Sequence, residues 1–141
     1  MTSRDSSSEK SPVLRLFDLS GRVAVVTGGA GLYGRQIVKA LAEAGAHTIM
    51  ASRNLPKLED EAARLQAAGL KVSAYGFDQS SEDSINNLLA HVVQTAGRVH
   101  VLVNNAVLRP MRDWTSPAAD FATSMEVNAT GLFLITRAFG Q

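Results

Sequence analysis

The stretch that decides the fold is VAVVTGGAGLYGRQIVKALAEAGA, residues 23–46. A β-branched apolar run bounded by glycines is typical of a strand buried on both faces. Glycines follow it, and a helical pattern begins at once, with apolar residues such as Val38 and Leu41 on one face. Gly45 then ends that pattern. The stretch therefore predicts a strand, a tight turn and a helix.

The rest of the chain repeats this alternation. Further strands are predicted at 46–52, 71–77 and 99–105, and further helices at 54–69, 80–97 and 116–135. The predicted helix starts are Asn54, Ser80 in a capping box with Asp83, and Ser116 before Pro117. Alternating strands and helices predict right-handed crossovers, and hence one α/β domain with a doubly wound parallel sheet over residues 14–141.

The composition narrows the class of protein. The chain has 141 residues, 45% of them hydrophobic and 19% charged, which is typical of one globular domain. The net charge is +1 and no run of basic residues occurs, so no surface for nucleic acid or for an anionic membrane is predicted. The absence of cysteine excludes disulfides, thiolate metal sites and cysteine nucleophiles. No apolar run is long enough to span a membrane.

The amino terminus reads MTSRDSSSEKSP, which is polar and rich in serine. It lacks the apolar segment of a secretory signal, so a cytoplasmic location is expected. Residues 1–13 are accordingly expected to form a disordered leader.

The glycine loop after the first strand predicts a dinucleotide site. In a doubly wound sheet, ligands bind at the carboxyl ends of the strands. Early glycines such as Gly28 permit a tight turn, a middle glycine lets the backbone approach a pyrophosphate, and Gly34 lets the helix pack closely. The helix N-terminus adds N–H donors and a positive dipole end. A structural turn that binds nothing is the alternative, because a glycine pattern alone is weak evidence.

The end of the second predicted strand bears on the choice of cofactor. An acidic residue about 20 positions after the glycines binds the ribose of NAD, whereas a nearby Arg accommodates the 2′-phosphate of NADP. Here the residues are Ser52 and Arg53, with no carboxylate. Arg53 therefore favours NADP, with NAD still possible, since a solvated surface arginine is the alternative interpretation.

From about Phe17 to its end, the chain resembles the short-chain dehydrogenase/reductase family. The likeness rests on four stretches in order: FDLSGRVAVVTGGAGLYGRQIVKALAEAGA, GFDQSS, VHVLVNNAV and SMEVNATGLFLITRAF. The resemblance implies a Rossmann fold and hydride transfer between NADP(H) and a carbonyl or alcohol substrate. It also implies a homo-oligomer, a dimer or a tetramer, once the protein is complete.

The resemblance also assigns roles to individual residues. It implies cofactor contacts at Gly28, Gly31, Leu32, Tyr33, Gly34, Ser52, Arg53, Asp78, Asn104 and Ala106. Among these, Asp78 matches the residue that contacts the adenine. Asn105 matches a residue that helps to hold the sheet together. Asn128 matches the asparagine of the catalytic tetrad.

Two departures from the family pattern lie in the cofactor motifs. Compact members carry a glycine where this chain has Leu32, and the glycine falls at Gly31 instead, a spacing found in the extended subgroup. Because the later motifs resemble the compact subgroup, we interpret the loop as a variant in a compact-type enzyme. Val107 replaces the glycine that usually follows Asn-Asn-Ala.

The third departure concerns the chemistry. The family uses a tyrosine as general acid/base, with a lysine four residues later that lowers its pKa, and an upstream serine. Tyr33 and Tyr75 are instead followed four residues later by Ile37 and Gln79. The chain is therefore expected to be an N-terminal portion, truncated after the family's fifth helix and without turnover of its own. A non-catalytic dinucleotide-binding or interaction module, or an inactive fragment, is the alternative.

No other chemistry is predicted. His47, His91 and His100 are widely spaced and lack metal-ligand spacing, so no metal is expected. Trp114, with Arg109 and Arg112 nearby, falls where the family begins its substrate loop, although a role in core packing or at the surface is favoured for each of these residues.

Overall fold

The computed structural model of the chain describes residues 11–141. Four parallel strands form one sheet: β1 (Val23–Thr27), β2 (His47–Ser52), β3 (Val72–Gly76) and β4 (Val101–Val103). Their order is β3-β2-β1-β4, so the direction of winding reverses between β1 and β4. In the register of the sheet, Val25 pairs with Ile49 on one side and with Leu102 on the other. The predicted doubly wound parallel sheet is confirmed.

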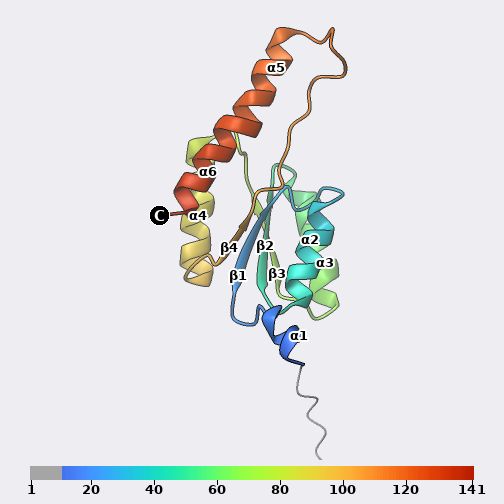
Figure 1. Cartoon of the computed structure of the whole chain (residues 1–141), viewed down its shortest axis with the longest axis vertical. Coiled ribbons are helices and arrows are strands. Elements are labelled where there is room, and N and C mark those ends of the chain that lie inside the picture. The colour runs from blue at the N-terminus through green and yellow to red at the C-terminus, as the bar shows by residue number, and fades with distance from the viewer. Residues whose placement is uncertain (1–10) are drawn as a thin grey trace, which may run out of the picture.

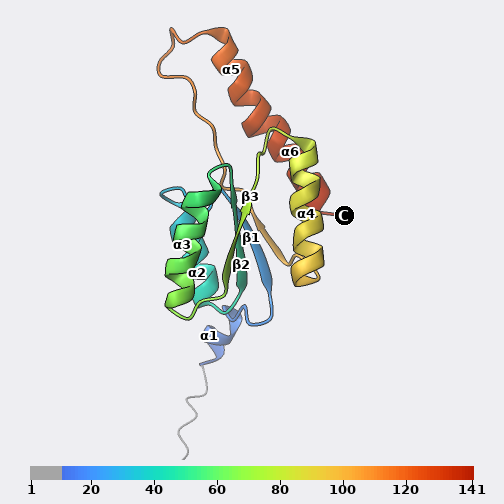
Figure 2. The same ribbon diagram turned by 180° about the vertical axis from the view of Figure 1, so that it is seen from behind.

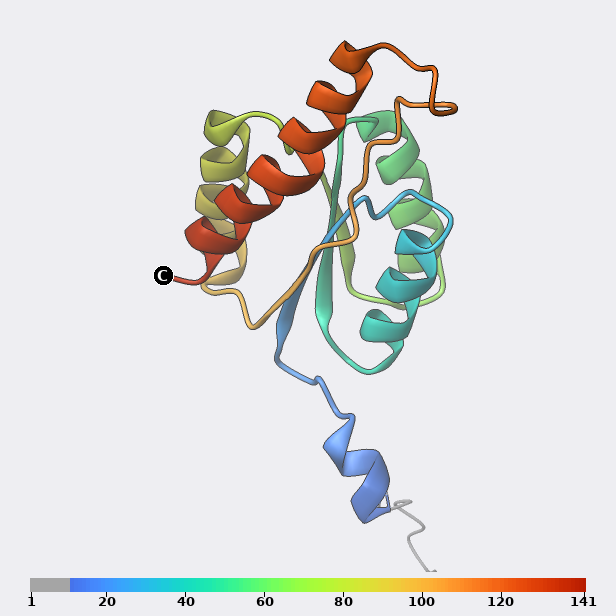
Figure 3. The same cartoon turned by 45° about the horizontal axis from the view of Figure 1, so that its top comes forward.

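Helices cover both faces of this sheet (Figures 1 and 2). They are α1 (Pro12–Leu16), α2 (Gly34–Glu43), α3 (Leu55–Ala67), α4 (Glu82–Ala96), α5 (Ala118–Met125) and α6 (Leu132–Phe139), with a π-helical turn, η1 (Glu126–Gly131), between the last two. Helices α2 and α3 lie on one face, and α4 and α6 lie on the other. Helix α5 projects beyond the carboxyl ends of the strands, and α1 lies at the opposite end (Figure 3).

The core consists of two apolar layers, one on each face of the sheet. Val26 and Met50 are fully buried in the layer beneath α2 and α3, whereas Val25 and Ile49 are buried in the layer beneath α4 and α6. Successive residues of a strand point to opposite faces, so a strand covered on both faces must be apolar throughout. The continuous apolar runs of the sequence have this cause.

The boundaries of several elements differ from the prediction. Strand β4 spans only three residues, because the chain leaves the sheet before Asn104. Ser81 caps α4 by accepting a hydrogen bond from the Ser84 N–H, so the prediction of Ser80 was wrong. The Ser80 hydroxyl instead donates to Asp78. Asn54 caps α3 through the Lys57 N–H, as predicted.

The last predicted helix differs more. Ser116 is not its N-cap, because the Ser116 hydroxyl accepts from the backbone N–H groups of Arg112 and Asp113. Pro117 occupies the N-cap position, and the helix continues through the π-helical turn as far as Phe139.

Most of the predicted leader, residues 1–13, lies outside the described residues. Its last part differs from the expectation, because Pro12 and Val13 belong to α1, which Ser11 caps through the Leu14 N–H. Within residues 11–141, no helix combines the length and the apolar character that a membrane span requires.

Candidate cofactor-binding site

The glycine loop folds back on itself at the carboxyl end of β1. Gly28 has φ +67°, in the left-handed region that favours glycine, and a Cβ there would lie 3.0 Å from the Ala106 Cα. Gly34 is the first residue of α2, and a Cβ at this position would overlap the Gly28 carbonyl oxygen. A side chain at Gly34 would therefore break the contact between the loop and α2, and one at Gly28 would crowd the segment after β4.

The loop residues Gly31, Leu32 and Tyr33 border an open cavity of about 610 Å³, together with Asn104 and Ala106. The side chains of Leu32 and Tyr33 are 67% and 73% exposed, so they extend away from the core of the loop. Among residues 11–141 only glycines have a positive φ. Leu32 therefore replaces the family's glycine without backbone strain.

The Thr27 hydroxyl joins β1 to the end of β4. It accepts hydrogen bonds from the N–H groups of Asn105 (3.1 Å) and Ala106 (3.0 Å) and donates to the Val103 carbonyl (3.4 Å). The Asn105 side chain in turn donates to the carbonyl oxygens of Thr27 (3.1 Å) and Gly28 (3.2 Å). These bonds fix the two strand ends at the point where the direction of winding reverses, which is where doubly wound sheets bind ligands.

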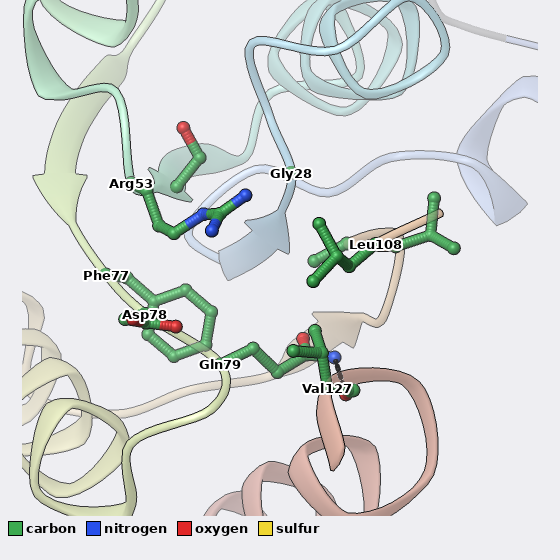
Figure 4. Close-up of a pocket in the computed structure, with 10 residues that line it drawn as sticks. Gly28, Arg53, Phe77, Asp78, Gln79, Leu108 and Val127 are labelled. Atoms are coloured by element: carbon green, nitrogen blue, oxygen red, sulfur yellow. Dashed lines mark hydrogen bonds between the residues drawn. The ribbon is translucent and has the colours of Figure 1, made fainter. Parts of the chain in front are cut away.

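A second, smaller cavity of about 140 Å³ lies beside the ends of β2 and β3. Its lining includes Ser52, Arg53, Phe77, Asp78, Gln79, Leu108 and Val127. Figure 4 shows Arg53, Phe77 and Asp78 on one side of this cavity, with Leu108 and Val127 on the other. Gly28 and Ala106 border both cavities, which are therefore neighbours.

Asp78 is held as a carboxylate at the edge of the smaller cavity. Its Oδ1 accepts hydrogen bonds from the Ser80 N–H (3.0 Å) and the Ser80 hydroxyl (2.8 Å). These bonds lower the pKa of Asp78 below its ordinary value, and the positive charge of Arg53 lowers it further. The cavity thus offers an ionised acceptor near a guanidinium group.

Asn128 lies in the π-helical turn and clamps the segment that follows β4. Its Oδ1 accepts from the Leu108 N–H (2.8 Å), and its Nδ2 donates to the Leu108 carbonyl (2.6 Å) and to the Ser124 hydroxyl (3.1 Å). π-helical turns occur frequently at functional sites. The Asn128 amide thus bonds to Leu108 and Ser124 and lines neither of the two cavities.

The structure brings ten of the eleven predicted site residues to the two cavities. Those at the larger cavity are Gly28, Gly31, Leu32, Tyr33, Gly34, Asn104 and Ala106, and those at the smaller are Gly28, Ser52, Arg53, Asp78 and Ala106. Asn128 borders neither cavity and adjoins one through its neighbour Val127.

Several lining residues were not predicted from the sequence. Phe77 ends the third apolar run directly before Asp78, and that position could have indicated it. No local signal marks Gln79, Leu108 or Val127, because they meet only when the segments after β3, β4 and α5 come together.

Two of the histidines have structural partners. The Nδ1 of His100 accepts a hydrogen bond from the Val23 N–H (3.0 Å), and the Nε2 of His47 lies 3.1 Å from the Ser73 hydroxyl. In the part of the chain that the structure describes, no three His, Cys, Asp or Glu side chains group in a way that could hold a metal ion.

Solved structures share this arrangement. A short-chain type dehydrogenase/reductase from Mycobacterium marinum is 31% identical with a TM-score of 0.84, and the match covers 89% of this chain and 51% of that one. The NADP active-site complex of Pseudomonas aeruginosa RhlG is 33% identical with a TM-score of 0.80, covering 87% and 48%. An NAD+-bound xylitol dehydrogenase is 28% identical with a TM-score of 0.75, covering 86% and 47%.

Sequence relatives agree with this likeness. Gluconate 5-dehydrogenase of Gluconobacter oxydans is 32% identical over 117 residues, and 2,3-dihydro-2,3-dihydroxybenzoate dehydrogenase of Bacillus subtilis is 31% identical over 124 residues. The matches cover 81% and 87% of this chain but 46% and 48% of the relatives, so the chain spans about half their length. The profile of the short chain dehydrogenase family matches residues 22–141. The chain therefore belongs to the short-chain dehydrogenase family.

Proposed function

We propose that this chain forms the cofactor-binding part of an NADP(H)-dependent dehydrogenase or reductase that acts on a carbonyl or alcohol substrate. One observation carries the proposal. The glycine loop, the start of α2 and Arg53 all border two adjoining cavities at the point where the direction of winding reverses. The bound nicotinamide would supply or accept the hydride.

The larger cavity suits a pyrophosphate. Helix α2 begins at Gly34, and its N-cap residue, Tyr33, makes no side-chain capping hydrogen bond. In contrast, Asn54 and Ser81 cap α3 and α4 through their side chains. The N–H groups of Arg35 and Gln36 already bond to the carbonyl oxygens of Gly31 and Tyr33, so the positive dipole end of α2 is what favours an anion there. We assign the pyrophosphate to the loop between Gly31 and Gly34.

The smaller cavity suits the adenosine end of the cofactor. Phe77 supplies an apolar wall and Asp78 an ionised acceptor, which together fit a flat base that carries N–H donors. Arg53 is exposed at the rim, where its guanidinium group could pair with a 2′-phosphate. Solved relatives include complexes with NADP and with NAD+, so our choice of NADP rests on Arg53 and on the lack of a carboxylate at Ser52.

The remaining assignments concern the chain's own residues. Asn128 holds the segment after β4 in place, and Asn105 holds the end of β1. Ile37 and Gln79 stand four residues after Tyr33 and Tyr75, so neither tyrosine has the lysine that accompanies the family's acid/base. We assign proton transfer to the part of the family's fold that this chain does not match. We also propose that the complete protein is a homo-oligomer.

Titration with NADPH and NADH tests the proposal directly. Calorimetry on the folded protein should show a single site that binds NADPH more tightly than NADH. If neither nucleotide binds, the dinucleotide site is wrong. Oxidation of NADPH by the full-length gene product with a panel of carbonyl compounds separates an enzyme from a non-catalytic binding module. Binding without any turnover across the panel would favour the module.

A further inference from the structure

Gln79 is a buried amide directly after Asp78, at a position where its side chain is only 4% exposed. Its Nε2 donates a hydrogen bond to the Val127 carbonyl (2.9 Å). Its Oε1 is buried and has no hydrogen-bond partner in the described structure. A buried acceptor without a partner is destabilising, so an apolar side chain of similar shape would suit this position better if packing were the only requirement. The amide donor therefore needs another explanation.

The acceptor of that hydrogen bond lies inside the π-helical turn η1. A second contact binds the same two segments, because a Cβ at Gly131 would overlap the Gln79 carbonyl oxygen. Gly131 has an ordinary helical conformation, with φ −62°, so glycine is required there by space rather than by backbone conformation. The segment after β3 thus holds η1 through one side-chain hydrogen bond and one close backbone approach.

The turn that Gln79 holds is also the turn that holds Leu108. Asn128 follows Val127 directly and makes both of its backbone hydrogen bonds to Leu108. Gln79, Val127 and Leu108 all line the smaller cavity (Figure 4). The hydrogen bonds from Gln79 to η1 and from η1 to Leu108 therefore join three walls of one cavity.

We propose that Gln79 is a positioning residue. Its hydrogen bond to Val127 fixes η1 against the segment after β3, and this in turn holds Asn128 in the geometry that clamps Leu108. The inference rests on the proposed function insofar as the smaller cavity receives the adenosine end of the cofactor. Loss of the Gln79 donor then loosens the Leu108 backbone and weakens dinucleotide binding, although Gln79 itself need not touch the cofactor.

The matched pair for the test is Gln79→Met and Gln66→Met. The Gln66 Nε2 also donates to a backbone carbonyl, that of Val72 (2.7 Å), far from η1. Both substitutions remove a side-chain amide donor and keep the length of the side chain. Only Gln79→Met should affect the smaller cavity.

Three measurements distinguish the outcomes. Amide hydrogen exchange at the Leu108 N–H should be about five-fold faster or more in Gln79→Met, and NADPH should bind more weakly by a similar factor. Urea unfolding should show a free energy of unfolding for Gln79→Met close to that of the parent protein, because the substitution removes the unpartnered Oε1 but also leaves the Val127 carbonyl without its side-chain donor. Gln66→Met should leave exchange at Leu108 and NADPH binding unchanged.

A positioning role is wrong if Gln79→Met leaves exchange at Leu108 unchanged. If that variant does not fold, Gln79→Asn provides the same test, since it keeps an amide that is too short to reach Val127. Exchange at Leu108 is measured without nucleotide. If NADPH fails to bind the parent protein, the proposed function fails, while the exchange comparison still decides the role of Gln79.

Discussion

Gly34 lies against the carbonyl oxygen of Gly28 so closely that no side chain fits between helix α2 and the end of β1. We predict that Gly34→Ala disrupts this contact and abolishes NADPH binding, measured by calorimetry. The control is Gly69→Ala. Gly69 has φ +82° and open space around it, so this variant should lose about 1–2 kcal/mol of stability through backbone strain while binding is kept. Normal NADPH affinity in a folded Gly34→Ala variant would contradict the assignment of the loop.

Replacement of Arg53 tests the choice of cofactor. A charge-assisted contact between arginine and phosphate contributes roughly 1.5–3 kcal/mol, so Arg53→Ala should weaken NADPH binding by about ten-fold or more. NADH affinity should change little, because NADH has no 2′-phosphate. Lys39→Ala is the control, since Lys39 forms an exposed ion pair with Glu43 away from both cavities. Equal losses for the two nucleotides would refute the role of Arg53.

Asn128→Asp tests the clamp on Leu108. The substitution removes both donors of Nδ2 and places a carboxylate against the Leu108 carbonyl oxygen. The free energy of unfolding should fall by about 1–3 kcal/mol in urea denaturation, since the half-buried Leu108 carbonyl loses its donor and faces a carboxylate instead. Asn87→Asp, at an exposed position of α4, should be close to neutral. Equal stability of the two variants would show that the clamp is unimportant.

His100 should make stability depend on pH. Desolvation, followed by the charges of Arg22 and Arg98, lowers the pKa of His100 below its ordinary value of 6.5. The unfolded chain therefore binds a proton at higher pH than the folded chain does. The contribution of His100 is complete above about pH 6.5 and is lost as the pH falls below it. The lost interaction is the hydrogen bond that Nδ1 accepts from Val23.

The test compares urea midpoints of the parent protein and His100→Asn at about pH 8 and about pH 5.5. Asparagine can accept the same hydrogen bond without titrating, so the variant should depend less on pH. Some dependence should persist, because burial and the charge of Lys71 also lower the pKa of His47. If the urea midpoint of His100→Asn changes with pH as much as that of the parent protein, His100 is not the source of the pH dependence.

A polypeptide of residues 1–141 on its own should self-associate and show no turnover. β4 forms one edge of the sheet, and large apolar side chains on α5, Phe121 and Met125, are 55% and 46% exposed. Exposed strand edges and apolar patches promote association. Light scattering over a range of concentrations measures this, and Phe121→Ser should reduce it. A monodisperse monomer at all concentrations would contradict the expectation.

The order of the elements could be predicted because local signals agree with the packing. Strands buried on both faces require apolar runs, and the ends of three helices fall at Gly45, Gly69 and Gly97, which all have positive φ. These are the positions at which the sequence predicted helix ends. Both patterns extend over only a few residues, so they can be recognised in the sequence without the tertiary structure.

Details that depend on competition between neighbours were less predictable. Ser80 and Ser81 are equally good capping residues by type, but the Ser80 hydroxyl is taken by Asp78. Likewise, the hydroxyl of Ser116 is taken by the turn before α5. A cap is decided by which serine has no better local partner, and spacing alone does not give that answer.

Part of the candidate site could likewise be predicted from the sequence, and part could not. The glycines, Arg53 and Asp78 lie at the ends of predicted strands, so topology alone brings them to one edge of the sheet. The π-helical turn was not predicted, because no residue pattern marks it. Its contacts with Gln79 and Leu108 come from segments distant in sequence, and only the folded chain brings them together.

The π-helical turn also limits which insertions and deletions the last helix can accept. Each residue of an α-helix turns the chain by about 100°, so the wide turn η1 decides the direction in which α6 presents its side chains. Ile135 is the buried residue of α6, whereas Asn128 contacts Leu108 from the turn itself. Deletion of Ala129 would allow a continuous α-helix, but it would swing either the core side chain or the clamp out of place. A substitution on the exposed side of this helix changes one side chain, whereas an insertion or deletion rotates every later side chain about the helix axis.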